Sequence, residues 1–155
     1  MNKLLFTFLL FFPIAMNAQQ KSNPVKFFNS PAVAPPKGYS QAVEIDLGNS
    51  RMILLSGQVP LDVKGNLVGN GDVSKQTEQI FENIKKIIAE AGGTMNDLVK
   101  IAIYMTDISQ VQKFRDVRDQ YINLKQPPTS TLVEVTKLFR EDVHIEIEAT
   151  AIIKK

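Results

Sequence analysis

The chain has 155 residues with a formal net charge of +2, and it contains neither cysteine nor tryptophan. The lack of cysteine excludes a disulfide framework and a lipidated cysteine anchor. Acidic and basic residues are interspersed, without the basic stripe or stacking aromatics that nucleic-acid binding normally needs. We therefore expect one small hydrophobic core and no nucleic-acid partner.

The first eighteen residues have the pattern of a secretory signal peptide. Lys3 supplies the positive start, the stretch from Leu4 to Ala15 is mainly apolar, and Ala18 suits the cleavage position. The apolar stretch is shorter than the about 20 residues that a membrane span requires. We expect residues 1–18 to be removed during export. The mature protein would then be periplasmic or secreted, with no membrane partner.

The segment that follows is proline-rich. Residues 19–36 carry four prolines among polar residues, a composition that disfavours regular structure and predicts an extended N-terminal arm. Residues 37–155 then form the folded domain. This domain opens with alternating segments at residues 41–47 and 51–56, separated by a reversal at residues 48–50, and the pattern predicts a β-hairpin.

Two later segments carry apolar residues at helical spacing. The first ends at Gly92, as helices commonly do, and the second covers residues 110–124. Between them, residues 99–106 are apolar on both faces, which predicts a buried strand. The candidate N-caps are Asp72 or Ser74 for the first helix and Asp107 or Ser109 for the second.

The C-terminal region, residues 131–135 and 143–153, predicts two strands joined by a short charged turn. On the second strand His144, Glu146 and Glu148 share one face because they are two residues apart. Such carboxylates either face water or line a polar site. His144 is the only histidine, so a Ser-His-Asp triad or a histidine metal cluster has no support, and we expect no metal and no cofactor.

The order of these elements predicts an α+β fold with one mixed sheet and two helices on one of its faces. Residues 99–106 and the final strands keep apolar side chains for the second face as well. No element of the chain remains to cover that face. We therefore expect other copies of the chain to cover it, and so a homo-oligomer.

Six segments carry a family resemblance in order and with family-like spacing. They are Lys37–Val43, Leu55–Pro60, Gln76–Thr77, Asn83–Ile84, Val133–Val135 and Val143–Ala149. Together they resemble the RidA/YjgF family of reactive-intermediate (enamine/imine) deaminases. The resemblance implies a chorismate-mutase-like fold, a homotrimer whose sheets form a central β-barrel, and small-molecule pockets at the subunit interfaces.

The resemblance also implies a site. In active members an arginine clamps the carboxylate of a 2-imino acid, and a glutamate positions the water that hydrolyses the imine to a 2-keto acid and ammonia. Carried onto this sequence, Glu146 is the catalytic residue, and Tyr39, Ser56 and Gly57 bind the substrate. Each has an ordinary alternative as a packing, strand-end or solvated residue. Glu148 repeats the geometry of Glu146 and is a second candidate.

The family's arginine is missing, because Ser130 stands at its position. A serine hydroxyl offers one donor and no charge, and losing a hydrogen bond to a charged group costs about 1.5–3 kcal/mol. Arg115, where the family commonly has a polar pocket residue, could bind the substrate instead. Its ordinary alternative is a solvated helix arginine paired with Asp116 or Asp119.

Three functions follow in order of support. The first is an exported trimer whose interface pocket binds a small imine, enamine or carbonyl metabolite, with hydrolytic deamination weakened or redirected by Ser130. The second is a non-catalytic small-molecule-binding or chaperone-like trimer. Endoribonuclease activity, attributed to some family members, ranks third because no strongly basic segment is present to hold RNA.

Overall fold

The computed structural model describes residues 23–155, so the expected signal peptide and the first residues of the arm lie outside the described part. Within it, six strands and two α-helices form one domain, with two short 3₁₀ helices, η1 and η2, in the connections. In chain order they are β1 (Val25–Phe28), β2 (Ala42–Asp46), β3 (Ser50–Gln58), α1 (Val73–Glu90), η1 (Met95–Asp97), β4 (Leu98–Met105), η2 (Ile108–Gln110), α2 (Val111–Tyr121), β5 (Thr129–Glu134) and β6 (Ile145–Lys154).

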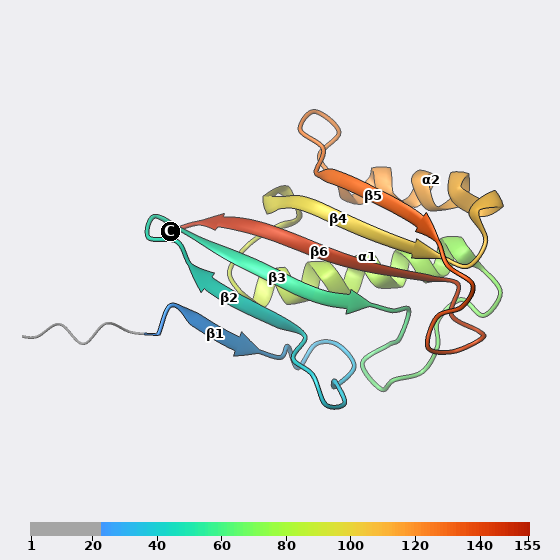
Figure 1. Cartoon of the computed structure of the whole chain (residues 1–155), viewed down its shortest axis with the longest axis horizontal. Coiled ribbons are helices and arrows are strands. Elements are labelled where there is room, and N and C mark those ends of the chain that lie inside the picture. Colours follow the sequence, from blue (N-terminus) through green and yellow to red (C-terminus); the bar gives the residue numbers. More distant parts are fainter. Residues whose placement is uncertain (1–22) are drawn as a thin grey trace, which may run out of the picture.

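The strands form one mixed sheet in the order β1-β2-β3-β6-β4-β5. β4 and β5 are parallel, and every other neighbouring pair is antiparallel. Both helices lie on the same face of this sheet (Figure 1). The expected α+β fold, with one mixed sheet and two helices on one face, is confirmed.

The two C-terminal strands are not neighbours, so the expectation of a short turn between them was wrong. The connection through α2 makes β5 parallel to β4, as a strand-helix-strand crossover does. The chain then needs the loop at residues 135–144 to reach the other side of β4, where β6 pairs antiparallel with it. This long loop forms part of the site described below.

The N-terminal arm contributes a strand that the sequence analysis did not predict. β1 pairs antiparallel with β2 at the edge of the sheet, and Val33 beyond it is buried in the core. The segment after β1 is held by Gln41, whose side chain accepts the Ser30 N–H at 2.6 Å and donates to the Ala34 carbonyl at 2.7 Å. Residues 25–28 contain no proline, and pairing with β2 satisfies their backbone groups.

Local signals fix both ends of α1. The carboxylate of Asp72 accepts the N–H groups of Ser74 and Lys75 at 3.0 and 3.2 Å, so Asp72 rather than Ser74 is the N-cap. The helix ends at Glu90 with Ala91 as its C-cap, and Gly92 follows with a φ of +77°, a conformation that favours glycine.

The second helix, α2, is shorter than the predicted range of residues 110–124. The turn before it is η2, and Asp107 caps this turn by accepting the Ser109 N–H at 2.9 Å. α2 packs against α1, where the rings of Phe81 and Tyr121 stack with their centroids 5.1 Å apart. The two helices therefore form one layer over the sheet.

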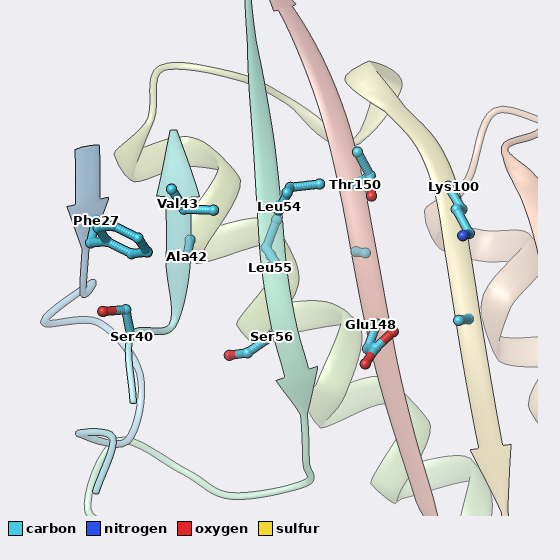
Figure 2. A pocket seen from close by; sticks show the side chains of 12 residues that line it. Phe27, Ser40, Ala42, Val43, Leu54, Leu55, Ser56, Lys100, Glu148 and Thr150 are labelled. Carbon is cyan, nitrogen blue, oxygen red and sulfur yellow. The ribbon is translucent and has the colours of Figure 1, made fainter. Parts of the chain in front are cut away.

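The two faces of the sheet differ in cover. The face under the helices carries side chains with essentially no exposure, including Ile53, Ile101, Ile103, Ile145 and Ile147. On the opposite face, which we call the open face, cross-strand pairing places one side chain from each of five adjacent strands in a row. The row is Phe27, Val43, Leu54, Thr150 and Lys100. These side chains line a shallow cavity of about 490 Å³ on that face (Figure 2).

Candidate functional site

A second and larger cavity, of about 770 Å³, lies where β3 ends and β6 begins, and we call it the Glu146 cavity. Its lining comes from both strands and from three loops: Ala34, Pro35, Lys37, Tyr39, Ser56, Gly57, Val59, Leu61, Lys64, Gly65, Phe139, Arg140 and Glu146. The structure thus brings together four of the six predicted site residues. Arg115 and Ser130 are not among the lining residues of this cavity.

A bulge near the end of β3 shapes the cavity. Leu55 pairs with Ala149 and Gln58 with Ile147, so β3 has one residue more than β6 between these two pairs. The extra residue belongs to Ser56–Gly57. A Cβ atom on Gly57 would lie 2.7 Å from Cδ of Glu146 and would overlap its carboxylate. Glycine at position 57 is therefore what lets the Glu146 side chain lie across the strand end.

Glu146 lies on β6 opposite Tyr104 of β4, and its side chain is about half-buried. Burial raises the pKa of the Glu146 carboxyl, and the charge of Glu148 raises this pKa further. No side chain of residues 23–155 donates a hydrogen bond to the Glu146 carboxylate. Its oxygens are therefore available to water or to a ligand in the cavity.

Glu148 and Tyr104 stand beside Glu146 on the open face. The Tyr104 hydroxyl lies 3.4 Å from Oε2 of Glu148, a long contact. The charge of Glu148, burial and the charge of Glu146 together raise the pKa of Tyr104. The sequence analysis did not single out Tyr104. Residues 99–106 are predicted as a strand, and the two-residue alternation of a strand is the signal that could have placed Tyr104 on one face with the carboxylates.

Ser56 and Tyr39 contribute differently from what their side chains suggest. The Ser56 hydroxyl donates to the Gln41 carbonyl at 3.1 Å, and the Ser56 N–H donates to the same oxygen at 3.0 Å. The donors of Ser56 are thus used within the fold, and its hydroxyl oxygen is left as an acceptor. Tyr39 is 54% exposed, so its ring forms an open wall of the cavity.

Gln76 explains one element of the sequence resemblance. This fully buried residue of α1 donates through Nε2 to the carbonyls of Gly69 at 3.1 Å and Asp142 at 2.8 Å, and its Oε1 accepts the His144 N–H at 2.8 Å. It therefore ties the loop before α1 and the loop before β6 to one point of the helix.

Asn83 does the same for a third segment. Its Nδ2 donates to the carbonyls of Val59 and Leu61 at 3.2 and 3.0 Å, and both of these residues line the Glu146 cavity. Together with Gln41, which holds the arm at Ala34, these buried amides fix the backbone of the loops that form the cavity. Their role is to position the site and not to contact a ligand.

Ser130 and Arg115 lie elsewhere in the chain. On β5, Ser130 pairs with Ile101, which faces the helices, whereas its neighbour Thr131 pairs with Ala102 opposite Glu148. Thr131, and not Ser130, thus shares the face of the carboxylates. Arg115 is exposed on α2, on the opposite side of the sheet from Glu146.

The cavity contains three cationic side chains that the sequence analysis did not consider, Lys37, Lys64 and Arg140. Arg140 lies in the charged loop between β5 and β6, where the sequence predicts only a short turn. Its side chain is bound by Asp142, through Nε to Oδ1 at 2.9 Å and through Nη2 to Oδ2 at 2.6 Å. Phe139, next to it, is 60% exposed and provides an apolar wall.

Two further observations concern residues 23–155 only. They contain no cluster of three or more histidine, cysteine, aspartate or glutamate side chains that could hold a metal ion. None of their helices combines the length and the hydropathy needed to cross a membrane.

Comparison with known proteins agrees with this fold. The family model described as Endoribonuclease L-PSP matches residues 29–153. The chain belongs to the RidA/YjgF family. The match includes β2 to β5, all but the last residue of β6, both α-helices and the whole lining of the Glu146 cavity.

The alignments with individual RidA/YjgF relatives extend over nearly the whole length of each relative. A RutC family protein of Pyrococcus abyssi is 38% identical over 124 residues, which is 80% of this chain and 93% of the relative. The 2-iminobutanoate/2-iminopropanoate deaminase of Dermatophagoides farinae is 30% identical over 133 residues, 85% of this chain and 99% of the relative. The structure of E. coli TdcF with bound serine is 30% identical, with a TM-score of 0.71 over 84% of this chain and 99% of TdcF.

Proposed function

We propose that this protein hydrolyses small 2-imino acids to 2-keto acids and ammonia in the Glu146 cavity. One observation carries the proposal. A half-buried carboxylate with a raised pKa lies over a glycine bulge, in a cavity that also contains Tyr39 and Ser56. The deaminase of Dermatophagoides farinae, a relative over 85% of the chain, supports this class of reaction.

The chemistry requires one water molecule and one base. The water oxygen attacks the imine carbon, and Glu146 takes a proton from that water as the C–O bond forms. Glu146 passes this proton to the imine nitrogen, which gives a carbinolamine. The carboxylate then takes the proton of the carbinolamine hydroxyl and delivers it to the same nitrogen. The C–N bond breaks as the carbonyl forms, and ammonia leaves. A carboxylate whose pKa is raised toward the working pH is a better proton acceptor than an ordinary glutamate, and positioned bases of this kind contribute about 10²–10⁴-fold in rate.

We propose a homotrimer as the working form. Support comes from the open face, where Leu54 is 37% exposed and Phe27 is 67% exposed in a single chain. Exposed apolar side chains gathered on one face of a sheet are suited to pack against a second sheet of the same kind. Three copies meeting at these faces would form a central barrel. The Glu146 cavity, at the edge of the open face, would then lie at a subunit boundary.

Export remains part of the proposal. It rests on Lys3 and the apolar stretch from Leu4 to Ala15, which are typical of a cleaved leader. Expression of the full chain in its host, followed by N-terminal sequencing of the extracytoplasmic fraction, tests it. A mature protein beginning at Gln19 is the expected result.

The decisive experiment follows ammonia and keto-acid release from freshly generated 2-iminopropanoate, above the spontaneous rate. We expect the mature protein to accelerate release and Glu146→Gln to lose about two to four powers of ten in rate. Glu148→Gln, the matched change two residues away, separates the two candidate carboxylates. If Glu148→Gln loses this activity and Glu146→Gln keeps it, the base is Glu148. An inactive wild type would refute the proposal.

A second function is favoured by one specific observation, the serine at position 130 where the family resemblance places an arginine. A non-catalytic small-molecule-binding or chaperone-like trimer would keep the cavity and lose hydrolysis. Ligand-dependent thermal stabilisation without turnover would support it. Ser130→Arg provides the complementary test, because a gain of activity would show that the scaffold still permits the reaction.

A further inference from the structure

The cation expected to hold a substrate carboxylate is missing at position 130, yet the Glu146 cavity is not without positive charge. Lys37, Lys64 and Arg140 line it together with a single carboxylate, that of Glu146. Even with the Asp142 carboxylate bonded to Arg140, cations outnumber anions at this cavity, which favours a negatively charged ligand. Which of these cations could orient the ligand depends on how each is held.

Arg140 is the only one of the three that is bound in a fixed orientation by another side chain of residues 23–155. Asp142 takes its Nε hydrogen and one Nη2 hydrogen in a two-point contact, at 2.9 and 2.6 Å. These mutual hydrogen bonds raise the pKa of Arg140 and lower the pKa of Asp142. A guanidinium has five N–H donors, so the two on Nη1 and the second on Nη2 remain for another acceptor.

The loop that carries this pair is itself anchored. The carbonyl of Asp142 accepts from the buried Gln76 at 2.8 Å, and the Val143 N–H donates to the Arg140 carbonyl at 3.3 Å. The Asp142 side chain therefore holds Arg140 from a backbone position that α1 fixes. A guanidinium fixed in this way loses little freedom when it binds a carboxylate, and its remaining edge matches a carboxylate in geometry.

We propose that Arg140, oriented by Asp142, is the anion-binding residue of the Glu146 cavity and replaces the arginine that is absent at position 130. The inference rests on the proposed function, because it assumes that the ligand is a small carboxylate. Lys37 and Lys64 add attraction without fixed geometry, since both are exposed point charges. The apolar lining, Pro35, Val59, Leu61 and Phe139, suits a carboxylate with an apolar side chain.

The test measures binding and not turnover. Isothermal titration calorimetry follows 2-oxobutanoate, and in parallel its neutral analogue 2-oxobutanamide, into wild type and variants. We expect Arg140→Gln to weaken 2-oxobutanoate binding by about ten- to a hundredfold. Arg140→Lys should recover only part of the affinity, because a lysine cannot make the two-point contact. The amide should bind weakly to wild type and Arg140→Gln alike.

Arg51→Gln is the matched control, because Arg51 also pairs with a carboxylate, that of Glu44 at 3.1 Å, but does not line the cavity. It removes the same charge from the protein and should leave binding unchanged. Thermal unfolding of each variant verifies that the fold is intact. Asp142→Asn should weaken binding less than Arg140→Gln does, since the guanidinium remains but is held less firmly.

Two results would overturn the inference: wild-type affinity in Arg140→Gln, or an equal loss for the amide. Turnover of 2-iminopropanoate by wild type is recorded separately. Arg140-dependent binding without any turnover would uphold the anion site and refute the deaminase. Turnover with Arg140-independent binding would do the reverse.

Discussion

The two faces of the sheet are made by alternate residues of the same strands, and they differ in almost every property. On β4, Ile103 faces the helices with 1% exposure, while Tyr104, the next residue, lies on the open face beside two carboxylates. On β6, Ile147 is fully buried between Glu146 and Glu148. One face therefore holds the fold together. The other is left for assembly and chemistry, and substitutions on the two faces should have different consequences.

The largest effect is expected on the open face of the assembled protein. Leu54→Lys would place three charges in the proposed interfaces, and each buried, unpaired charge costs several kcal/mol. We expect the variant to sediment as a monomer with an unchanged circular dichroism spectrum. Leu124→Lys, in the loop after α2 where the leucine is 61% exposed, is the control. A Leu54→Lys protein that remained trimeric would place the interface elsewhere.

On the helix-covered face, substitutions should lower the stability of the fold and not disrupt assembly. Ile103→Ala removes a fully packed side chain from the core, and we expect a loss of about 2–5 kcal/mol in the free energy of unfolding. Urea unfolding at one fixed protein concentration measures it, because an oligomer's stability depends on concentration. Tyr104→Phe, one residue away, removes only a hydroxyl from the open face. We expect a change of about 1 kcal/mol or less, and similar losses in both variants would contradict the division between the faces.

The helix-covered layer was also the part that could be predicted from sequence. The N-cap at Asp72, the glycine at position 92 and the apolar spacing between them are local signals, and they define α1 correctly. β1 was missed because four prolines in residues 19–36 dominate the local pattern, whereas its pairing with β2 is a contact between separate segments. The position of β6 beyond β4 depends on the crossover through α2, which strand patterns alone do not reveal.

The site residues, too, divide into those that the sequence predicts and those that only the structure reveals. The motif matches, and not strand chemistry, drew attention to Glu146 and Gly57, and the structure places them in contact. Arg140 could not be found from sequence. It reaches the cavity because Gln76, 66 residues before Asp142, donates a hydrogen bond to the loop that carries Arg140. Local sequence patterns cannot predict a contact between residues so far apart in the chain.

Gln76 lies on α1 but anchors the loop that carries Arg140. Its replacement should therefore affect both the stability of the fold and the binding of ligand, with an intermediate loss of stability. Gln76→Ala leaves two carbonyls and the His144 N–H without their partner, and an unsatisfied buried polar group costs about 1–3 kcal/mol. We expect a loss of that size in urea unfolding, and weaker 2-oxobutanoate binding because the loop that carries Arg140 is released. Lys86→Ala, exposed on the same helix, should change neither quantity. Lower stability with full affinity would separate Gln76 from the site.

The smallest effect on stability is expected at Glu146, where replacement should stabilise the fold instead of weakening it. Because burial and Glu148 raise the pKa of Glu146 in the folded protein, the ionised carboxylate opposes folding. The stability that its protonated form provides is complete below the ordinary pKa of 4.5 and is lost as pH rises through the folded pKa. Glu146→Gln keeps the neutral form at every pH. It should therefore melt at a higher temperature than wild type at pH 7 and at the same temperature at the acid end.

Thermal scans of both proteins between pH 4 and pH 8 measure this difference. Glu78→Gln makes the same chemical change at an exposed position of α1 and corrects for the loss of one surface charge. If Glu146→Gln gains stability while it loses turnover, the carboxylate is maintained at a cost to the fold, as expected for a residue that serves chemistry. If it instead loses stability at neutral pH, Glu146 is an ordinary structural residue, and the catalytic role would have to be assigned to another group.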